Sequence, residues 1–285
     1  MRYGINILLW TDTLQDSVLP VLDELKSAGY DAVELPCFEY APKTYATWGK
    51  RLDEVGLART ACTVVGADAN PISPDKSVRR KGIDAVKGAL ECAKAAGCES
   101  LVGPFHSALG HFSGAGPTPA EWKWGVESMR AIAEFADQCG VNLGLEFLNR
   151  FECYFLNTAA DTARFCRDVD HPRCRMMYDT FHANIEEKDV VAAIRTAGPY
   201  LVHVHISEND RSTPGSGGVR WQETFDTLRE VGYDNLMVIE AFGLSLEKLV
   251  PTCKIWRRMY ESEMQLVRDA LAFMKQNVQK RWGKA

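Results

Sequence analysis

The sequence predicts an α/β fold of one kind, a single (β/α)8 TIM barrel that spans residues 1–285 as one domain. Short apolar runs alternate with longer amphipathic stretches along the whole chain, and such alternation indicates a parallel sheet covered by helices. Eight of these repeats follow one another without a linker, a low-complexity segment or a change in composition. Eight unbroken repeats favour a closed barrel over an open doubly wound sheet, and the chain length suits such a barrel.

The eight expected strands are the short apolar runs, at residues 3–9, 32–37, 58–65, 100–105, 142–148, 174–180, 201–207 and 236–242. The eight expected helices lie between and after them, at residues 16–28, 44–55, 75–96, 119–139, 158–169, 187–197, 221–231 and 253–282. Six of the helical runs are followed by a glycine just before the next strand, namely Gly29, Gly56, Gly97, Gly140, Gly198 and Gly232. A helix C-terminus favours a residue that tolerates positive φ, so these glycines support the boundaries.

Composition excludes several classes of function. The formal net charge is −5, the isoelectric point is near 5.8 and no long basic run occurs, so nucleic acid is not an expected partner. The nine cysteines form no C-x-x-C pair, which argues against a zinc ribbon or a disulfide framework. No signal-peptide core and no apolar stretch near 18 residues occurs, so we expect a soluble cytoplasmic protein without a membrane partner.

Four successive strands in the second half each end in a side chain that can bind a divalent cation. The four residues are Glu146, Asp179, His205 and Glu240. Strand carboxyl ends converge on one face of a barrel, where active sites are built. Three carboxylates and one imidazole suit Mn²⁺, Co²⁺ or Mg²⁺. The joint pattern therefore predicts a metal-dependent enzyme, and the longest loops after strands, residues 110–119 and 209–218, are expected on the same face.

Each of these residues also has a plainer interpretation. Glu146 could pair with Arg150 at the end of its strand, and Asp179 could cap a following helix. His203 and His205 lie two residues apart, so both point to the same face of their strand. Only the residue nearer the mouth of the barrel reaches the site, and we therefore expect His205 as the ligand with His203 in a lower layer.

Three sequence strings resemble those of a known family. They are Glu146–Glu152 (EFLNRFE), Asp179–Glu187 (DTFHANIEE) and His203–Arg211 (HVHISENDR). They resemble the ketose 3-epimerases, the D-tagatose 3-epimerase and D-psicose 3-epimerase group of the xylose-isomerase-like TIM barrels. Val238–Phe242 resembles the last strand of that family. The resemblance extends over nearly the whole chain and is most specific in the second half.

The resemblance implies a set of site residues. The metal ligands would be Glu146, Asp179, His205 and Glu240, and the substrate-binding groups would be Glu152, His182 and Arg211. Without the resemblance, the last three would pass for a rim carboxylate, a loop histidine and a solvated arginine. The resemblance also implies one divalent metal ion (Mn²⁺, with Co²⁺ or Mg²⁺ as alternatives), a small-molecule ketose substrate, and a homodimer or homotetramer.

Epimerisation of a ketose at C3 removes a proton from a carbon next to a carbonyl and returns one to the opposite face. The cis-enediolate formed in between needs electrostatic stabilisation, which a metal ion can supply. We expect Glu146 and Glu240 to be the acid/base pair, with the order of their action depending on the direction of reaction.

Other functions remain open on the same barrel. A metal-dependent aldose–ketose isomerase, similar to hydroxypyruvate or xylose isomerase, would move the proton between C1 and C2, and an inosose dehydratase is a further alternative. The context of Arg150 to Glu152 and the presence of His182 favour the epimerase. An endonuclease IV-type enzyme needs three zinc ions and many histidines, whereas this chain has six histidines and a negative charge. A sugar-binding regulatory protein would not need the ligand quartet.

Overall fold

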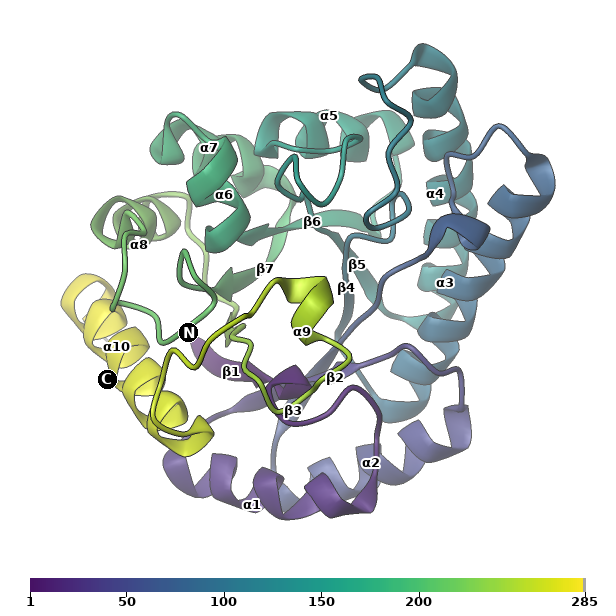
Figure 1. The fold of residues 1–285 in the computed structure, drawn as a ribbon. Helices are drawn as coiled ribbons and strands as arrows, with labels where there is room; N and C mark the ends of the chain where they lie inside the picture. The colour runs from purple at the N-terminus through teal and green to yellow at the C-terminus, as the bar shows by residue number, and fades with distance from the viewer. Residues whose placement is uncertain (284–285) are drawn as a thin grey trace.

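Eight parallel strands close into a barrel in a computed structural model that describes residues 1–283 (Figure 1). The strands are β1 (Arg2–Asn6), β2 (Ala32–Pro36), β3 (Ala58–Cys62), β4 (Ser100–Gly103), β5 (Asn142–Leu145), β6 (Cys174–Asp179), β7 (Leu201–Ile206) and β8 (Leu236–Ile239). Each strand pairs with its neighbours in chain order, and β1 also pairs with β8. Gly4 of β1, for example, lies opposite Ala32 on one side and Val238 on the other. The predicted (β/α)8 fold is confirmed.

A ring of helices surrounds the strands, and one short helix lies in front of them (Figure 1). They are α1 (Leu19–Ala28), α2 (Pro42–Val55), α3 (Lys76–Ala96), α4 (Pro119–Cys139), α5 (Ala159–Val169), α6 (Thr180–Glu186), α7 (Val190–Ala197), α8 (Trp221–Glu230), α9 (Val250–Cys253) and α10 (Glu263–Trp282). Short 3-10 turns lie at Ile7–Leu9, Asp16–Val18, Ala67–Ala69 and Gly198–Tyr200. Among the described residues, no helix is both long and apolar enough to cross a membrane.

Local sequence explains how the helices begin and how they pack. The Thr118 hydroxyl accepts a hydrogen bond from the Glu121 backbone N–H, and the Glu121 carboxylate accepts one from Thr118, which forms a capping box at the start of α4. In α5 the buried residues recur with helical spacing, so that one face packs on the barrel; they include Thr162, Phe165 and Val169.

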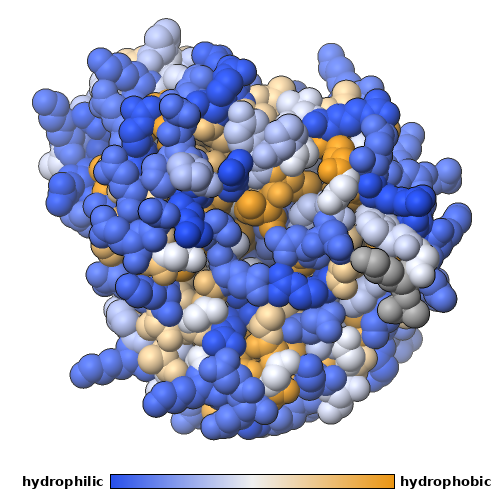
Figure 2. Space-filling model, turned by 180° about the vertical axis from the view of Figure 1, so that it is seen from behind, coloured by the Kyte–Doolittle hydropathy of each residue, from blue (hydrophilic) through white to orange (hydrophobic). Residues whose placement is uncertain are grey.

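Hydrophilic side chains cover most of the rear of the molecule, with smaller hydrophobic patches between them (Figure 2).

The structure corrects the prediction of one long final helix at residues 253–282. The segment instead forms the single turn α9, and α10 begins only at Glu263. Lys254 ends α9 in the left-handed region, with φ of 59°, and the Ser262 hydroxyl caps α10 by accepting from the Gln265 N–H. Apolar residues from both parts had suggested one continuous periodicity. The break leaves α9 across the mouth of the barrel, in front of the strands in Figure 1.

Two further boundaries differ from the prediction. The segment after β6 forms the short helix α6, which was not expected, and the next helix starts at Val190 with Asp189 as its cap. Gly198 does not take a positive φ, because the chain continues from α7 into a 3-10 turn through Pro199. The α6 helix matters for function, because it carries His182 into the mouth of the barrel.

Candidate active site

The ends of β5, β6, β7 and β8 bring four ionisable side chains together at the mouth of the barrel. They are Glu146, Asp179, His205 and Glu240, and all four are buried. Each offers one ligand atom, and these atoms lie within 4.8 Å of one another. Two ligands on opposite sides of one ion, each at roughly 2.0–2.2 Å, are about as far apart. The cluster therefore has the size of a site for one divalent cation.

Backbone contacts on both sides place Glu146. Its N–H donates to the carbonyl of Gly103 at the end of β4, with an N···O distance of 3.1 Å. Its carbonyl oxygen lies 2.8 Å from Nε2 of the buried His106. The guanidinium of Arg150 pairs with Glu186 at 2.9 Å. Arg150 is therefore not the ionic partner of Glu146, which leaves this carboxylate to the cluster.

Asp179 has two structural roles at once. Its Oδ1 accepts from the N–H of Phe181 at 2.8 Å and so caps α6. Its Oδ2 faces the cluster and accepts from Nη1 of Arg211 at 2.7 Å. Asp179 also lies opposite His205 in the pairing of β6 with β7. The helix-cap interpretation and the cluster interpretation are thus compatible.

The orientation of His205 is set from below by Glu34 of β2. The His205 Nε2 lies 2.8 Å from Oε1 of Glu34, and this fully buried carboxylate also accepts from Asn6 at 2.9 Å and from Thr60 at 2.8 Å. The other ring nitrogen, Nδ1, is turned toward the cluster, 3.4 Å from Oε1 of Glu240. It is buried and has no hydrogen-bond partner among the described residues. An orphaned imidazole nitrogen beside three carboxylates fits a metal ion.

Glu34 was not predicted as a site residue. It lies inside the apolar run Ala32–Pro36, and a glutamate there needs a partner, because an isolated buried carboxylate is costly. That is the signal that could have found it. His203 lies one layer below His205, with Nε2 3.0 Å from the second oxygen of Glu34. Burial raises the pKa of Glu34, but the charges of the two histidines outweigh burial and lower it overall.

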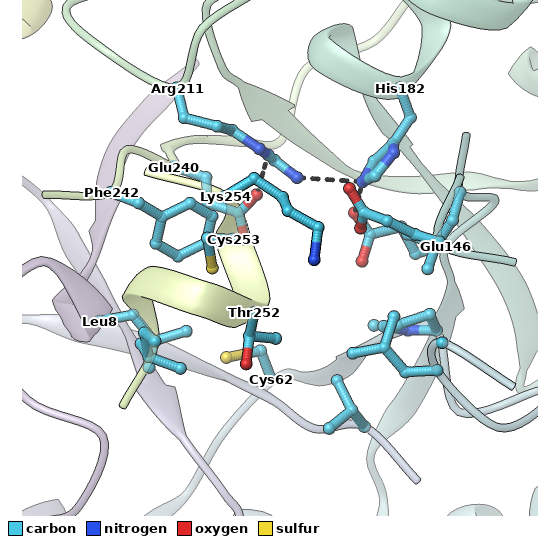
Figure 3. A pocket seen from close by; sticks show the side chains of 18 of the residues that line it. Leu8, Cys62, Glu146, His182, Arg211, Glu240, Phe242, Thr252, Cys253 and Lys254 are labelled. Atoms are coloured by element: carbon cyan, nitrogen blue, oxygen red, sulfur yellow. Dashed lines mark hydrogen bonds and ion pairs between the residues drawn. The ribbon is translucent and has the colours of Figure 1, made fainter. Parts of the chain in front are cut away.

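Arg211 reaches the cluster from the loop after β7. Its Nη1 donates to Oδ2 of Asp179 and also to Oε2 of Glu240. Its Nη2 lies 3.0 Å from Nε2 of His182 (Figure 3). The guanidinium lies over the Phe181 ring, with 3.9 Å from its carbon to the ring centroid. Arg211 is only 7% exposed. It is therefore a fixed part of the site rather than a solvated side chain.

His182 lies between two donor groups. Its Nδ1 accepts from the backbone N–H of Asn149 at 3.0 Å, and its Nε2 lies 3.0 Å from Nη2 of Arg211, a group that can only donate. Nε2 lies 3.5 Å from Oε1 of Glu146. Burial and the charge of Arg211 lower the pKa of His182 well below its usual value, which keeps the ring neutral. Glu152 also lines the cavity, where its carboxylate accepts from the side-chain amide of Asn149 at 2.9 Å.

The two glutamates of the cluster have opposite electrostatic surroundings. Burial and the charges of Glu240 and Asp179 raise the pKa of Glu146 well above its usual value. Burial acts in the same direction on Glu240, but His205 and Arg211 outweigh it and lower the pKa of Glu240 to about 2. Burial raises the pKa of Asp179 to about 6 against the opposing charge of Arg211. Before a cation enters, the surroundings thus favour a protonated Glu146 and an ionised Glu240.

A cavity of about 480 Å³ lies over the cluster. Its wall includes Leu8, Phe38, Cys62, Leu109 and Phe242 together with the α9 segment. Figure 3 shows Lys254 of this segment directed into the cavity, between Arg211 and Thr252. The side chains from α9 were not predicted, because the sequence suggested a helix that starts there and runs away from the site. The cavity is large enough for a small polar molecule.

The chain belongs to the xylose isomerase-like TIM barrel family, whose model matches residues 22–277. It is 33% identical over 261 residues to the D-psicose 3-epimerase of Agrobacterium fabrum, and the alignment covers 90% of each chain. The structure of an L-ribulose 3-epimerase is similar with a TM-score of 0.93 and 30% identity, covering 99% of this chain and 95% of that one.

A D-allulose 3-epimerase from Methylomonas sp., crystallised in complex with D-allulose, is similar with a TM-score of 0.90 and 28% identity, covering 97% of each chain. These relatives are ketose 3-epimerases, a class of isomerase that acts on carbohydrates. The resemblance seen in the sequence strings and the expected class of enzyme are confirmed.

Proposed function

We propose that this protein epimerises a free ketose at C3. The observation that carries the proposal is that Glu240 and Glu146, two members of the ligand cluster, line the same cavity and face each other across it (Figure 3). Two carboxylates on opposite sides of one carbon can remove and return a proton on different faces. The similarity of this chain to ketose 3-epimerases supports the same reaction.

The cofactor in this proposal is one divalent cation held by Glu146, Asp179, His205 and Glu240. Three carboxylates and an imidazole suit Mn²⁺, with Co²⁺ or Mg²⁺ as alternatives. When bound, the cation supplies a positive charge that polarises the C2 carbonyl and stabilises the negative charge that develops as C3 loses its proton.

The glutamates carry the proton transfers. One carboxylate takes the proton from C3, and the electron pair of the C–H bond moves toward the C2 carbonyl to give an enediolate. The other glutamate, protonated beforehand, then donates its proton to the opposite face of C3, and the carbonyl forms again. The next turnover in the same direction requires each glutamate to regain its starting proton state.

Three further side chains would bind the substrate. The imidazole of His182 and the guanidinium of Arg211 line the cavity on the side of the cluster where the oxygens near the carbonyl would lie. Glu152 also lines the cavity, and its carboxylate can accept from a sugar hydroxyl. These contacts would fix the sugar so that C3 lies between the two glutamates.

The proposed reaction is tested by following proton exchange at each carbon of D-fructose, D-tagatose and L-ribulose by NMR in D2O. We expect the protein supplied with Mn²⁺ to incorporate deuterium at C3 and to form the C3 epimer. The Mn²⁺ is removed after the reaction, before the spectra are recorded. We expect neither product after prior treatment with a chelator, because both need the loaded cluster.

Two results would contradict the proposal. Deuterium at C1 with formation of an aldose would identify an aldose–ketose isomerase instead. Exchange at C3 that persists in fully metal-free protein would remove the cation from the reaction. The apoprotein reloaded with Mn²⁺ is the control, since recovery of exchange excludes damage by the chelator.

Substitution of Glu34 by Gln is expected to weaken Mn²⁺ binding by about 10- to 100-fold, the usual effect of losing a carboxylate that orients a histidine ligand. Glutamine cannot hold His205 as a charged acceptor does, so Nδ1 is less firmly directed at the cluster. Competition with a fluorescent chelator measures the affinity without reference to turnover. Glu134→Gln, at an exposed position of α4, is the matched control, and equal affinities of the two variants would contradict the role of Glu34.

A further inference from the structure

Glu208 is a fully buried carboxylate in the loop after β7, separated from the strand by Ser207, and no cationic side chain forms an ion pair with it in the described part of the chain. Four N–H groups donate to it instead. Oε1 accepts from the backbone of Asn209 at 3.0 Å and of Val219 at 3.2 Å, and Oε2 accepts from the backbone of Gly215 at 2.8 Å and from Nε1 of Trp221 at 3.1 Å. A buried carboxylate is tolerated when it accepts several such bonds.

These four bonds tie both ends and the middle of the loop from Glu208 to Trp221 to one carboxyl group. The backbone packs directly against it at Gly217, where a Cβ atom would lie 2.7 Å from Oε1 of Glu208 and 2.2 Å from Oδ1 of Asn209. Asn209 adds a further bond, because its Oδ1 accepts from the N–H of Gly218 at 2.6 Å. The loop is thus folded around Glu208.

Arg211 projects from this loop, and its backbone conformation is an unusual one. Its φ is 65°, in the left-handed region that residues other than glycine rarely adopt. Its N–H donates to the carbonyl of Glu208 at 3.0 Å, and its own carbonyl accepts from the N–H of Phe242 at 3.0 Å. This conformation directs the guanidinium at Asp179 and Glu240. An uncommon conformation persists only where its surroundings fix it.

We propose that Glu208 is a positioning residue for Arg211: its carboxylate holds the loop in the one conformation that places the guanidinium in the site. The inference rests on the proposed function, in which Arg211 binds the substrate. Glu208 itself does not line the cavity and would not touch the sugar. A carboxylate is required because all four partners are donors, whereas the amide nitrogen of a glutamine would face an N–H group.

Two variants disturb the loop in different ways. Glu208→Gln replaces one of the two acceptor oxygens with an amide nitrogen. Gly217→Ala forces the backbone away from the Glu208 carboxylate without a change in charge. Each is combined with Arg211→Ala, and kcat/KM for C3 epimerisation is measured for all single and double variants. We expect each loop variant alone to lower kcat/KM by about 10- to 100-fold, as residues that orient a functional group do.

Coupling to Arg211 separates positioning from a general structural role. In the Arg211→Ala background we expect either loop change to alter kcat/KM by less than about 3-fold, because the group it positions is already absent. The control Leu90→Val lowers stability from α3, on the other side of the barrel, and should act equally in both backgrounds. Equal factors for Glu208→Gln in both backgrounds, or wild-type kinetics in the single variant, would overturn the proposal. Gly217→Ala answers the question if Glu208→Gln does not fold.

A second readout does not depend on turnover. Arg211 is nearly buried, so trypsin should cut after it slowly in the wild-type protein. We expect faster cleavage after Arg211 in both loop variants, with cleavage outside residues 208–221 unchanged, and an unchanged rate after Arg211 would overturn the proposal. If no ketose is epimerised by the wild-type protein, the proposed function fails, while this cleavage still decides whether Glu208 holds Arg211 in place.

Discussion

Substitution of Glu240 by Gln is expected to lower C3 epimerisation by about 10³- to 10⁴-fold, the upper range for the loss of an acid or base group. The glutamine cannot take a proton from C3. Its oxygen can still accept from Nη1 of Arg211, and its amide nitrogen then faces Nδ1 of His205, so we expect the side chain to stay in place and the fold to be retained. Steady-state epimerisation of the best ketose, with the Mn²⁺ content measured in parallel, gives the factor.

In the Glu240→Gln variant, deuterium exchange should occur at one face of C3 only. If Glu240 and Glu146 act on opposite faces of C3, Glu240→Gln leaves Glu146 able to remove and return a proton on its own face. One C3 epimer of the substrate should then still take up deuterium from D2O without being converted, while the other epimer should not. Glu146→Gln should give the mirror image, with exchange in the other epimer.

This pair of variants distinguishes the two-glutamate mechanism from simple damage to the cation site. Loss of the cation would suppress exchange in both epimers to the same extent. Turnover within a few-fold of wild type in either variant, or exchange in both epimers, would contradict the assignment of the acid/base pair. Glu134→Gln, with the same chemical change at an exposed position, should behave as wild type.

The parts of the site that could be predicted from sequence are those with a local signature. Glu146, Asp179, His205 and Glu240 each close an apolar run, and barrel topology alone brings such ends to one face. Glu34 has no such signature, because it lies within a strand and its partner His205 is 171 residues away. Only the closed barrel shows that the two meet.

The loops explain the remaining differences. α9 and α10 both contain apolar residues at helical spacing, but the left-handed Lys254 between them depends on packing that no local pattern records. The Glu208 loop was expected on the catalytic face, yet the four bonds that shape it join residues up to 13 positions apart. Local periodicity therefore predicts the scaffold, and long-range contacts decide which loop side chains enter the cavity.

Substitution of Arg211 by Ala is expected to lower kcat/KM by about 10²- to 10³-fold, as the removal of one fixed hydrogen-bond donor from a reacting oxygen does. The loss should fall mainly on KM if Arg211 only binds the sugar, and on kcat if it acts when charge develops at the carbonyl. Arg150→Ala is the matched control, because Arg150 is exposed at the rim and pairs only with Glu186 among the described residues. Unchanged kinetics of Arg211→Ala across ketoses would remove this residue from the site.

Stability gives a second test of Arg211, because its guanidinium neutralises two buried carboxylates, Asp179 and Glu240. Removing one partner of a buried ion pair costs about 3–5 kcal/mol, which would lower Tm by on the order of 10 °C in the metal-free protein. A divalent cation in the cluster supplies positive charge at the same carboxylates, so saturating Mn²⁺ should raise the Tm of Arg211→Ala more than that of wild type. Equal Mn²⁺-induced shifts in the two proteins would show that the guanidinium and the cation do not act on the same charges.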